Sequence, residues 1–146
     1  MNDDAFKVVY NKALDIISRT AHSQKELTRK LLDKFSEEEI VNSVINNLVK
    51  KNLLNDTRYS EAYVVSRKRK GFGPKKILYE LIARGVIENI AYEAIENEGG
   101  WKDAALKAFN KKFKKGKSMD FKELNKQKTF LQNRGFSFEE IDSVFT

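Results

Sequence analysis

The feature that most constrains this chain is a repeat with a period of about fifty residues. Three basic residues keep this spacing, and each is followed within two residues by an apolar side chain: Lys34, Arg84 and Arg134. Leucines precede them at the same spacing: Leu31, Leu81 and Leu131. A unit of this size is only marginally stable alone, so we expect each unit to be stabilised by stacking on its neighbours.

Within each unit the apolar residues recur at helical spacing, and no segment shows the strict alternation of a half-buried strand. The chain has one proline and seven glycines, so few residues interrupt helices. We therefore predict an all-α protein of about nine helices, arranged as three tandem three-helix repeats. The expected repeats are residues 1–55, 56–99 and 100–146.

Several residues predict where these helices begin. A Ser or Asp followed three residues later by Glu is typical of a capping box. Four such pairs occur, and they are Ser23 with Glu26, Ser36 with Glu39, Asp120 with Glu123, and Ser137 with Glu140. We also expect Asp56 to cap a helix and Pro74 to occupy a first helical position.

The composition argues against catalysis and metal binding. The chain has no cysteine and one histidine, His22, which we expect at the surface or in a helix cap. No Gly-rich loop has the spacing of a phosphate-binding motif, and the many carboxylates fit helix starts. We expect no enzyme activity, no metal and no cofactor. No run of about 18 apolar residues is present, so we expect no membrane span. We also expect a cytoplasmic protein and a monomer.

The net charge of +7 is unevenly distributed along the chain. Residues 57–76 contain seven basic and one acidic side chain, and residues 101–128 contain ten basic and three acidic ones. Between them, residues 77–100 contain one basic and five acidic side chains. Two basic blocks at similar places in successive repeats suggest contact with a polyanion or an acidic protein face.

The first basic block surrounds a predicted helix end. Cations at a helix C-terminus complement its dipole, and one or two are enough for that. The cluster here is larger and continues into the start of the next helix, where the dipole disfavours cations. We therefore assign a binding patch to Arg67, Lys68, Lys70, Lys75 and Lys76. Phe72, between them, fits a core position better than a stacking platform for a base, and the same holds for Tyr59 and Tyr63.

The second basic block is predicted to lie on one face of a helix that buries Trp101 and Phe109 on its other face. Few carboxylates stand four residues away to neutralise this lysine face. An anionic partner and a solvated surface are equally consistent with it. The candidate binding residues here are Lys107, Lys111, Lys114 and Lys115.

Two segments of the middle repeat resemble the signatures of the bacterial RecX family. The first runs from Leu54-Asn55-Asp56 through Arg58-Tyr59-Ser60 to Arg67, and the second from Gly73-Pro74 through Glu80-Leu81 to Arg84-Gly85-Val86. The opening segment, with Ser23 to Leu27, is also similar, although His22 stands where family members often have arginine. The match covers residues 13–98 and extends through the third repeat mainly by its helix pattern.

The resemblance implies an elongated, curved array of three-helix units that binds in the groove of the RecA–DNA filament. Such proteins lower the ATPase, strand-exchange and coprotease activities of RecA and have no catalytic site. The alternative is a helical module that binds DNA or RNA directly, without a recombinase. A third and weaker hypothesis is a nuclease with a hidden carboxylate pair, which magnesium-dependent cleavage would reveal.

Overall fold

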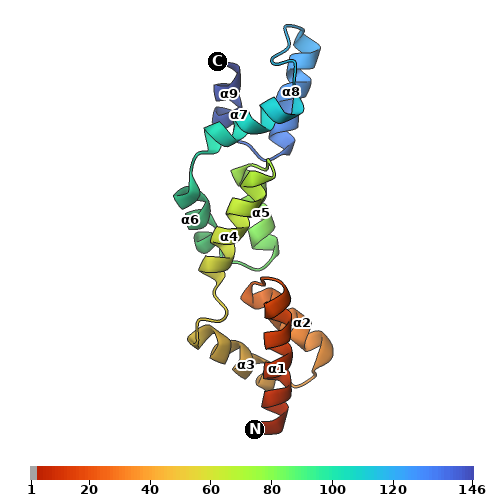
Figure 1. The fold of residues 1–146 in the computed structure, drawn as a ribbon, viewed down its shortest axis with the longest axis vertical. Helices are drawn as coiled ribbons and strands as arrows, with labels where there is room; N and C mark the ends of the chain where they lie inside the picture. The colour runs from red at the N-terminus through yellow and green to blue at the C-terminus, as the bar shows by residue number, and fades with distance from the viewer. Residues whose placement is uncertain (1–2) are drawn as a thin grey trace.

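The computed structural model describes residues 3–146, and Figure 1 shows their arrangement. Within that range there are nine helices and no strand. The helices are α1 (Asp3–Arg19), α2 (Gln24–Lys34), α3 (Glu38–Lys50), α4 (Asp56–Arg69), α5 (Pro74–Ala83), α6 (Glu88–Glu98), α7 (Trp101–Lys112), α8 (Phe121–Asn133) and α9 (Phe138–Phe145).

The helices form three successive units, each with its own hydrophobic core. The cores are centred on Leu27 and Leu48 in the first unit, on Val64 and Leu81 in the second, and on Phe109 in the third. The first and third helices of each unit pack against each other, and the second helix closes the core. The prediction of an all-α fold with tandem three-helix repeats is confirmed. Figure 1 shows an elongated molecule with the two termini at opposite ends.

The second and third units are joined end to end through their second helices. The backbone N–H of Gly73 donates to the carbonyl of Arg134 at 2.7 Å, and that of Lys75 donates to the carbonyl of Gly135 at 2.9 Å. These N–H groups lie at the start of α5, and these carbonyls lie at the end of α8. Each helix end therefore satisfies polar groups that a helix terminus otherwise leaves without partners.

The first and second units meet in the same way. Ser23, at the start of α2, donates its hydroxyl to the carbonyl of Arg84 at the end of α5, at 2.6 Å. Arg84 also pairs with Glu26 at 3.1 Å. The backbone N–H of Gln24 donates to the buried carboxylate of Asp56 at 2.9 Å. The second helices α2, α5 and α8 thus stack head to tail along one side of the molecule (Figure 1).

Both junctions require a glycine at the helix end. Gly85 and Gly135 have φ angles of +90° and +99°, which side-chain-bearing residues rarely adopt. A Cβ on Gly85 would lie 2.5 Å from the Cβ of Lys25, and a Cβ on Gly135 would overlap the side chain of Lys76. The helix ends can approach each other only because these positions carry no side chain.

Most of the predicted helix starts are confirmed. The capping boxes of Ser23 and Ser137 form with both of their hydrogen bonds. Asp120 caps α8 through the backbone N–H of Glu123, and Pro74 is at the start of α5.

Two predicted caps are wrong. The box at Ser36 does not form, because α3 begins at Glu38 after Glu37, which makes no side-chain cap. Asn55 caps α4 by accepting from the N–H of Arg58, so Asp56 lies inside the helix and serves the first junction instead.

The expectation for His22 is also wrong. The side chain is only 7% exposed. Its Nδ1 lies 2.7 Å from the carbonyl of Thr20, and its Nε2 lies 2.6 Å from the Nζ of Lys30. The sequence does not indicate that His22 is buried. Its two partners lie within eight residues of it, but neither forms a recognisable motif with a histidine.

Over the described part of the chain, no helix is long and apolar enough to cross a membrane. In the same part of the chain, no three His, Cys, Asp or Glu side chains come together as metal ligands would.

The junction geometry predicts an effect of Gly135→Ala on stability. The variant must bear both a strained φ angle and a clash with Lys76, so we expect a loss of about 2–4 kcal/mol in the free energy of unfolding. Gly116→Ala is the matched control, because Gly116 has a φ of +81° but no atom within 4 Å of the added Cβ. Urea unfolding measures both, and equal losses would contradict the close contact at the junction.

Candidate docking surface

The two basic blocks of the sequence meet in a cleft between the end of α4 and one face of α7. The cleft has a volume of about 420 Å³. Its cationic wall consists of Lys68, Arg69, Lys70, Lys107 and Lys111. Glu98 and Asp103 are the acidic residues that line it, and Val65, Ala104 and Ala108 provide apolar surface. Residues some forty positions apart in the chain therefore share one positively charged hollow.

Two of the predicted binding residues have partners inside the chain. The Arg67 guanidinium donates to both carboxylate oxygens of Glu80, at 2.9 and 2.8 Å, and stacks 3.9 Å from the centre of the Phe72 ring. Lys68 pairs with Glu98 at 2.9 Å and donates to the carbonyl of Gly99 at 2.8 Å. Their charges are already neutralised, so both residues organise the surface more than they offer charge to a partner.

Glu80 shows how strong the first of these networks is. Burial alone would raise the pKa of its carboxyl group, but hydrogen bonds from Arg67 and Tyr63 outweigh burial and hold the pKa below its ordinary value. The Tyr63 hydroxyl donates to Glu80 at 2.9 Å. Tyr59 is buried beside Tyr63, and Phe72 packs against the second core, so all three aromatic residues are core side chains as predicted.

Lys75 and Lys76 lie away from the cleft, in the first turn of α5. Lys75 is exposed, whereas Lys76 is half-buried against Gly135 and lies 5.3 Å from the centre of the Phe72 ring. Lys76 is therefore part of the junction between the second and third units. Lys75 remains free to meet a partner on the outer side of the molecule.

Lys107 and Lys111 are exposed one turn apart on α7. The prediction that Lys114 and Lys115 share this helical face is wrong, because α7 ends at Lys112 and both residues lie in the following turn. Phe113 follows the last helical residue as its C-cap and packs with Phe109 in the third core. The spacing of the lysines alone gave no sign of this early end.

The cleft also contains a cation that the sequence reasoning left out. Arg69 is exposed and lines the cleft beside Val65, four residues earlier on the same face of α4. That spacing was visible in the sequence. The sequence alone does not show that α7 lies opposite this face, so the spacing could not assign Arg69 to a cleft.

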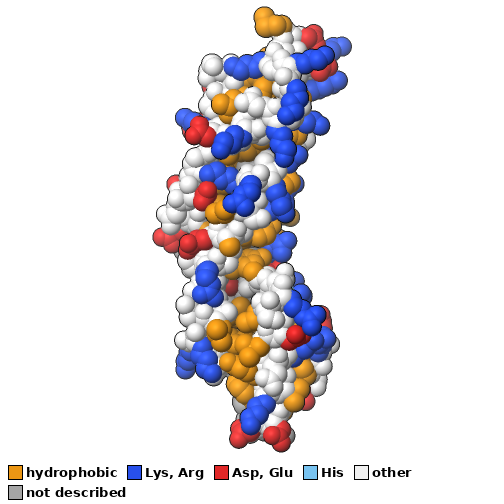
Figure 2. Space-filling view, in the orientation of Figure 1, with side chains coloured by type: hydrophobic (Ala, Val, Ile, Leu, Met, Phe, Trp, Pro, Cys, Tyr) orange, Lys and Arg blue, Asp and Glu red, His pale blue; other side chains and the backbone are white. Residues whose placement is uncertain are grey.

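A second pattern of charge emerges from the stack of second helices, which we call the spine (residues 24–34, 74–84 and 121–134). These segments contain eleven basic and four acidic side chains, a net charge of +7. The rest of the chain is therefore neutral overall. Lys and Arg side chains gather along the right-hand side of Figure 2, where α2, α5 and α8 lie in Figure 1.

These features define a class of protein: a rod of three helical repeats with a basic spine and a basic cleft at one junction. Such a rod presents positive charge along its length, and within residues 3–146 it has no cluster of metal-ligating side chains. Solenoid-like repeat arrays commonly use their length for binding in this way.

Comparison with known proteins places the chain in a family. The models of the first, second and third three-helix domains of RecX match residues 10–48, 55–95 and 102–145. The chain belongs to the RecX family.

Its relatives are named regulatory proteins. It is 33% identical to the regulatory protein RecX of Pseudomonas tolaasii over 144 residues, which cover 98% of this chain and 93% of that protein. It is 40% identical to RecX of Vibrio campbellii (strain ATCC BAA-1116) over 130 residues, covering 88% and 84%. The crystal structure of RecX from Lactobacillus salivarius has a TM-score of 0.83 and 26% identity, covering 99% and 96%.

The Arg67–Glu80 network predicts a pH-dependent stability. Replacing Glu80 by Gln keeps its shape but removes its charge, and we expect a loss of about 1–3 kcal/mol at neutral pH. Because folding lowers the pKa of Glu80, its contribution is complete above the ordinary value of 4.5 and disappears as the pH falls through the lowered value.

Chemical unfolding of wild type and Glu80→Gln from neutral to acidic pH measures this difference. We expect the two stabilities to converge as the pH falls from 4.5 through the lowered pKa of Glu80. A difference that stays constant across the whole range would contradict the role assigned to the carboxylate.

Proposed function

We propose that this chain binds the RecA–DNA filament and lowers its ATPase, strand-exchange and coprotease activities during DNA repair and recombination. The observation that carries the proposal is the presence of all three RecX domains, joined end to end by hydrogen bonds between helix termini. A chain joined in this way can contact several filament subunits at once. It would act as a regulator through binding, without a catalytic step of its own.

The dimensions of the spine support this role. Its helices contain 11, 10 and 13 residues. At 1.5 Å per residue they extend over about 50 Å. An anionic partner that extends over such a distance would meet cations on all three helices of the spine.

The basic cleft supplies the docking residues in this proposal. Arg69, Lys70, Lys107 and Lys111 are exposed around it. We assign docking to these four, together with Lys75 on the spine and the turn residues Lys114 and Lys115. We assign a structural role to Arg67, Lys68 and Lys76, because their side chains already have partners within the chain.

The test is the ATPase rate of the recombinase on single-stranded DNA with and without this chain. We expect inhibition at equimolar or lower amounts. The double variant Lys107→Gln and Lys111→Gln should raise the half-inhibitory concentration about tenfold, which corresponds to about 1.4 kcal/mol.

Lys102→Gln is the matched control, since Lys102 is exposed on the same helix but does not line the cleft. It should inhibit like wild type, and circular dichroism should show equal helicity in all three proteins. Unchanged inhibition by the double variant would show that the cleft is not part of the docking surface.

The charge of the spine favours a second candidate function, direct binding of DNA or RNA without a recombinase. Neutralising six to ten phosphates would cost about 10³–10⁵ in affinity between 50 and 200 mM salt. A filament-groove binder should lose less affinity and should need the recombinase. Tight, strongly salt-dependent binding to free nucleic acid, without inhibition of the ATPase, would favour this second function.

A further inference from the structure

The first repeat contains a second basic cleft, between α1 and α2, which the charge count along the chain does not predict. Residues 1–56 have equal numbers of basic and acidic side chains, nine of each. The structure nevertheless gathers four cations around a hollow of about 370 Å³. They are Lys12, Arg19, Lys30 and Lys34, and the acidic residues lining the same hollow are Asp15 and Asp33. The cleft therefore carries an excess of two positive charges.

The charges in this cleft are incompletely compensated. Asp15 is shared between Lys12, at 3.7 Å, and Arg19, at 3.2 Å. The Nζ of Lys30 contacts the ring of the buried His22. Lys12 and Lys34 stand beside each other, and contact with the Lys12 ammonium, followed by repulsion from its charge, lowers the pKa of Lys34. Two ammonium groups this close repel each other, and the nearby Asp15 offsets only part of that effect.

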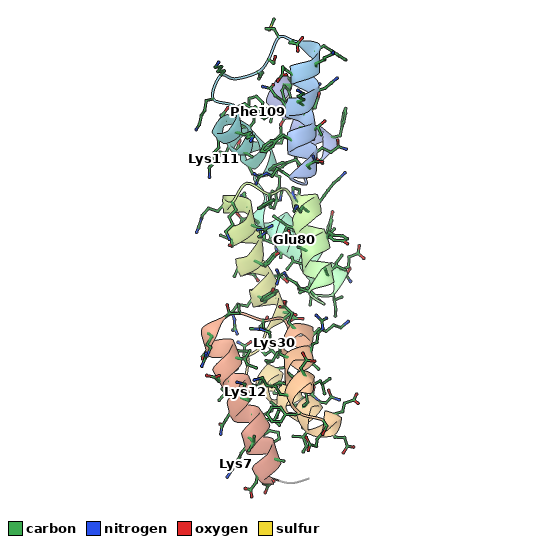
Figure 3. The ribbon with its side chains drawn as sticks, turned by 90° about the vertical axis from the view of Figure 1, so that its right-hand side faces the viewer. Lys7, Lys12, Lys30, Glu80, Phe109 and Lys111 are labelled. Carbon is green, nitrogen blue, oxygen red and sulfur yellow. The ribbon has the colours of Figure 1, made fainter. Side chains whose placement is uncertain are left out.

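The second repeat shows what is missing from the first. Glu80 lies between α4 and α5, fifty residues and therefore one repeat after Lys30. There the Glu80 carboxylate accepts hydrogen bonds from Arg67 and Tyr63 and neutralises the charge of Arg67 between the two helices. Figure 3 shows Lys12 and Lys30 between α1 and α2, and Glu80 in the corresponding place between α4 and α5. The first repeat thus has a cation where the second has an anion.

The geometry points to an oxyanion site in this cleft, in which Lys12, Lys30 and Lys34 bind a phosphate group that takes the place of the Glu80 carboxylate. A phosphate fits better than a carboxylate, because the surplus of two charges matches a dianion and lysines bind phosphate as point charges from several directions. The phosphate could belong to a nucleic-acid backbone or to a small phosphorylated molecule. The site does not depend on the recombinase, and its test is separate from the ATPase assay.

Thermal unfolding in pyrophosphate, compared with chloride at equal ionic strength, tests the site. Wild type should unfold about 3–5 °C higher when pyrophosphate exceeds its dissociation constant tenfold. Lys12→Gln and Lys34→Gln should each lose this shift. Lys34→Gln also removes the repulsion with Lys12 and leaves the Lys12–Asp15 pair intact, so this variant should unfold at a temperature no lower than that of wild type in chloride.

Lys7→Gln is the matched control, since Lys7 is exposed on α1 but does not line the cleft (Figure 3). It should keep the full pyrophosphate shift. Equal shifts in all four proteins would overturn the site, because they would show general charge screening. Stabilisation by polyglutamate but not by pyrophosphate would also overturn it, in favour of an acidic protein partner.

Competition separates the two sources of phosphate. If a short single-stranded oligonucleotide displaces pyrophosphate from wild type, measured by calorimetry, the cleft binds backbone phosphate. If pyrophosphate binding persists unchanged, the cleft takes a small phosphorylated ligand. Both results support an oxyanion site at Lys12 and Lys34.

Discussion

The contact between successive second helices is the interaction on which the rest of the structure depends. Each three-helix unit has a small core of its own, and a core of this size gives little stability alone. The end of α5 meets the start of α2, and the end of α8 meets the start of α5, through hydrogen bonds at 2.6 to 2.9 Å. These bonds satisfy helix termini that would otherwise need water. They also set the direction of the rod and align the cations of the spine.

Local patterns in the sequence predicted local structure well. The helices, the repeat and most caps follow from apolar spacing and from side chains that act within three or four residues. The failures lie where a residue serves a contact far away in the chain. Asp56 has the chemistry of a cap, but its carboxylate accepts from Gln24 across the first junction. Arg84 and Arg134 mark the repeat in the sequence, but their partners also lie far away in the chain: Arg84 pairs with Glu26, and Arg134 lies 4.7 Å from the centre of the Phe72 ring.

The number of charged residues in each segment was predictable from the sequence, but their positions in the folded structure were not. Counting along the chain found two basic blocks, and the cleft between α4 and α7 unites them. The same count missed the cleft of the first repeat, because its cations are spread from Lys12 to Lys34 among acidic residues, of which Glu26 pairs with Arg84 and Asp15 is shared by two cations. It also could not show that Arg67 and Lys68 are neutralised within the chain. Which cations are free depends on helix packing, and no local pattern encodes that.

The central claim is that the junctions make the three repeats one rod, and the absence of cysteine permits a direct measurement. Spin labels attached through Val8→Cys and Phe138→Cys would report the distance between the first and third repeats, since both positions are exposed. Pulsed electron spin resonance should give a single narrow distance distribution for the free chain, and the same distance on the recombinase filament. A broad or multiple distribution in the free chain would show that the repeats move independently and would contradict the claim.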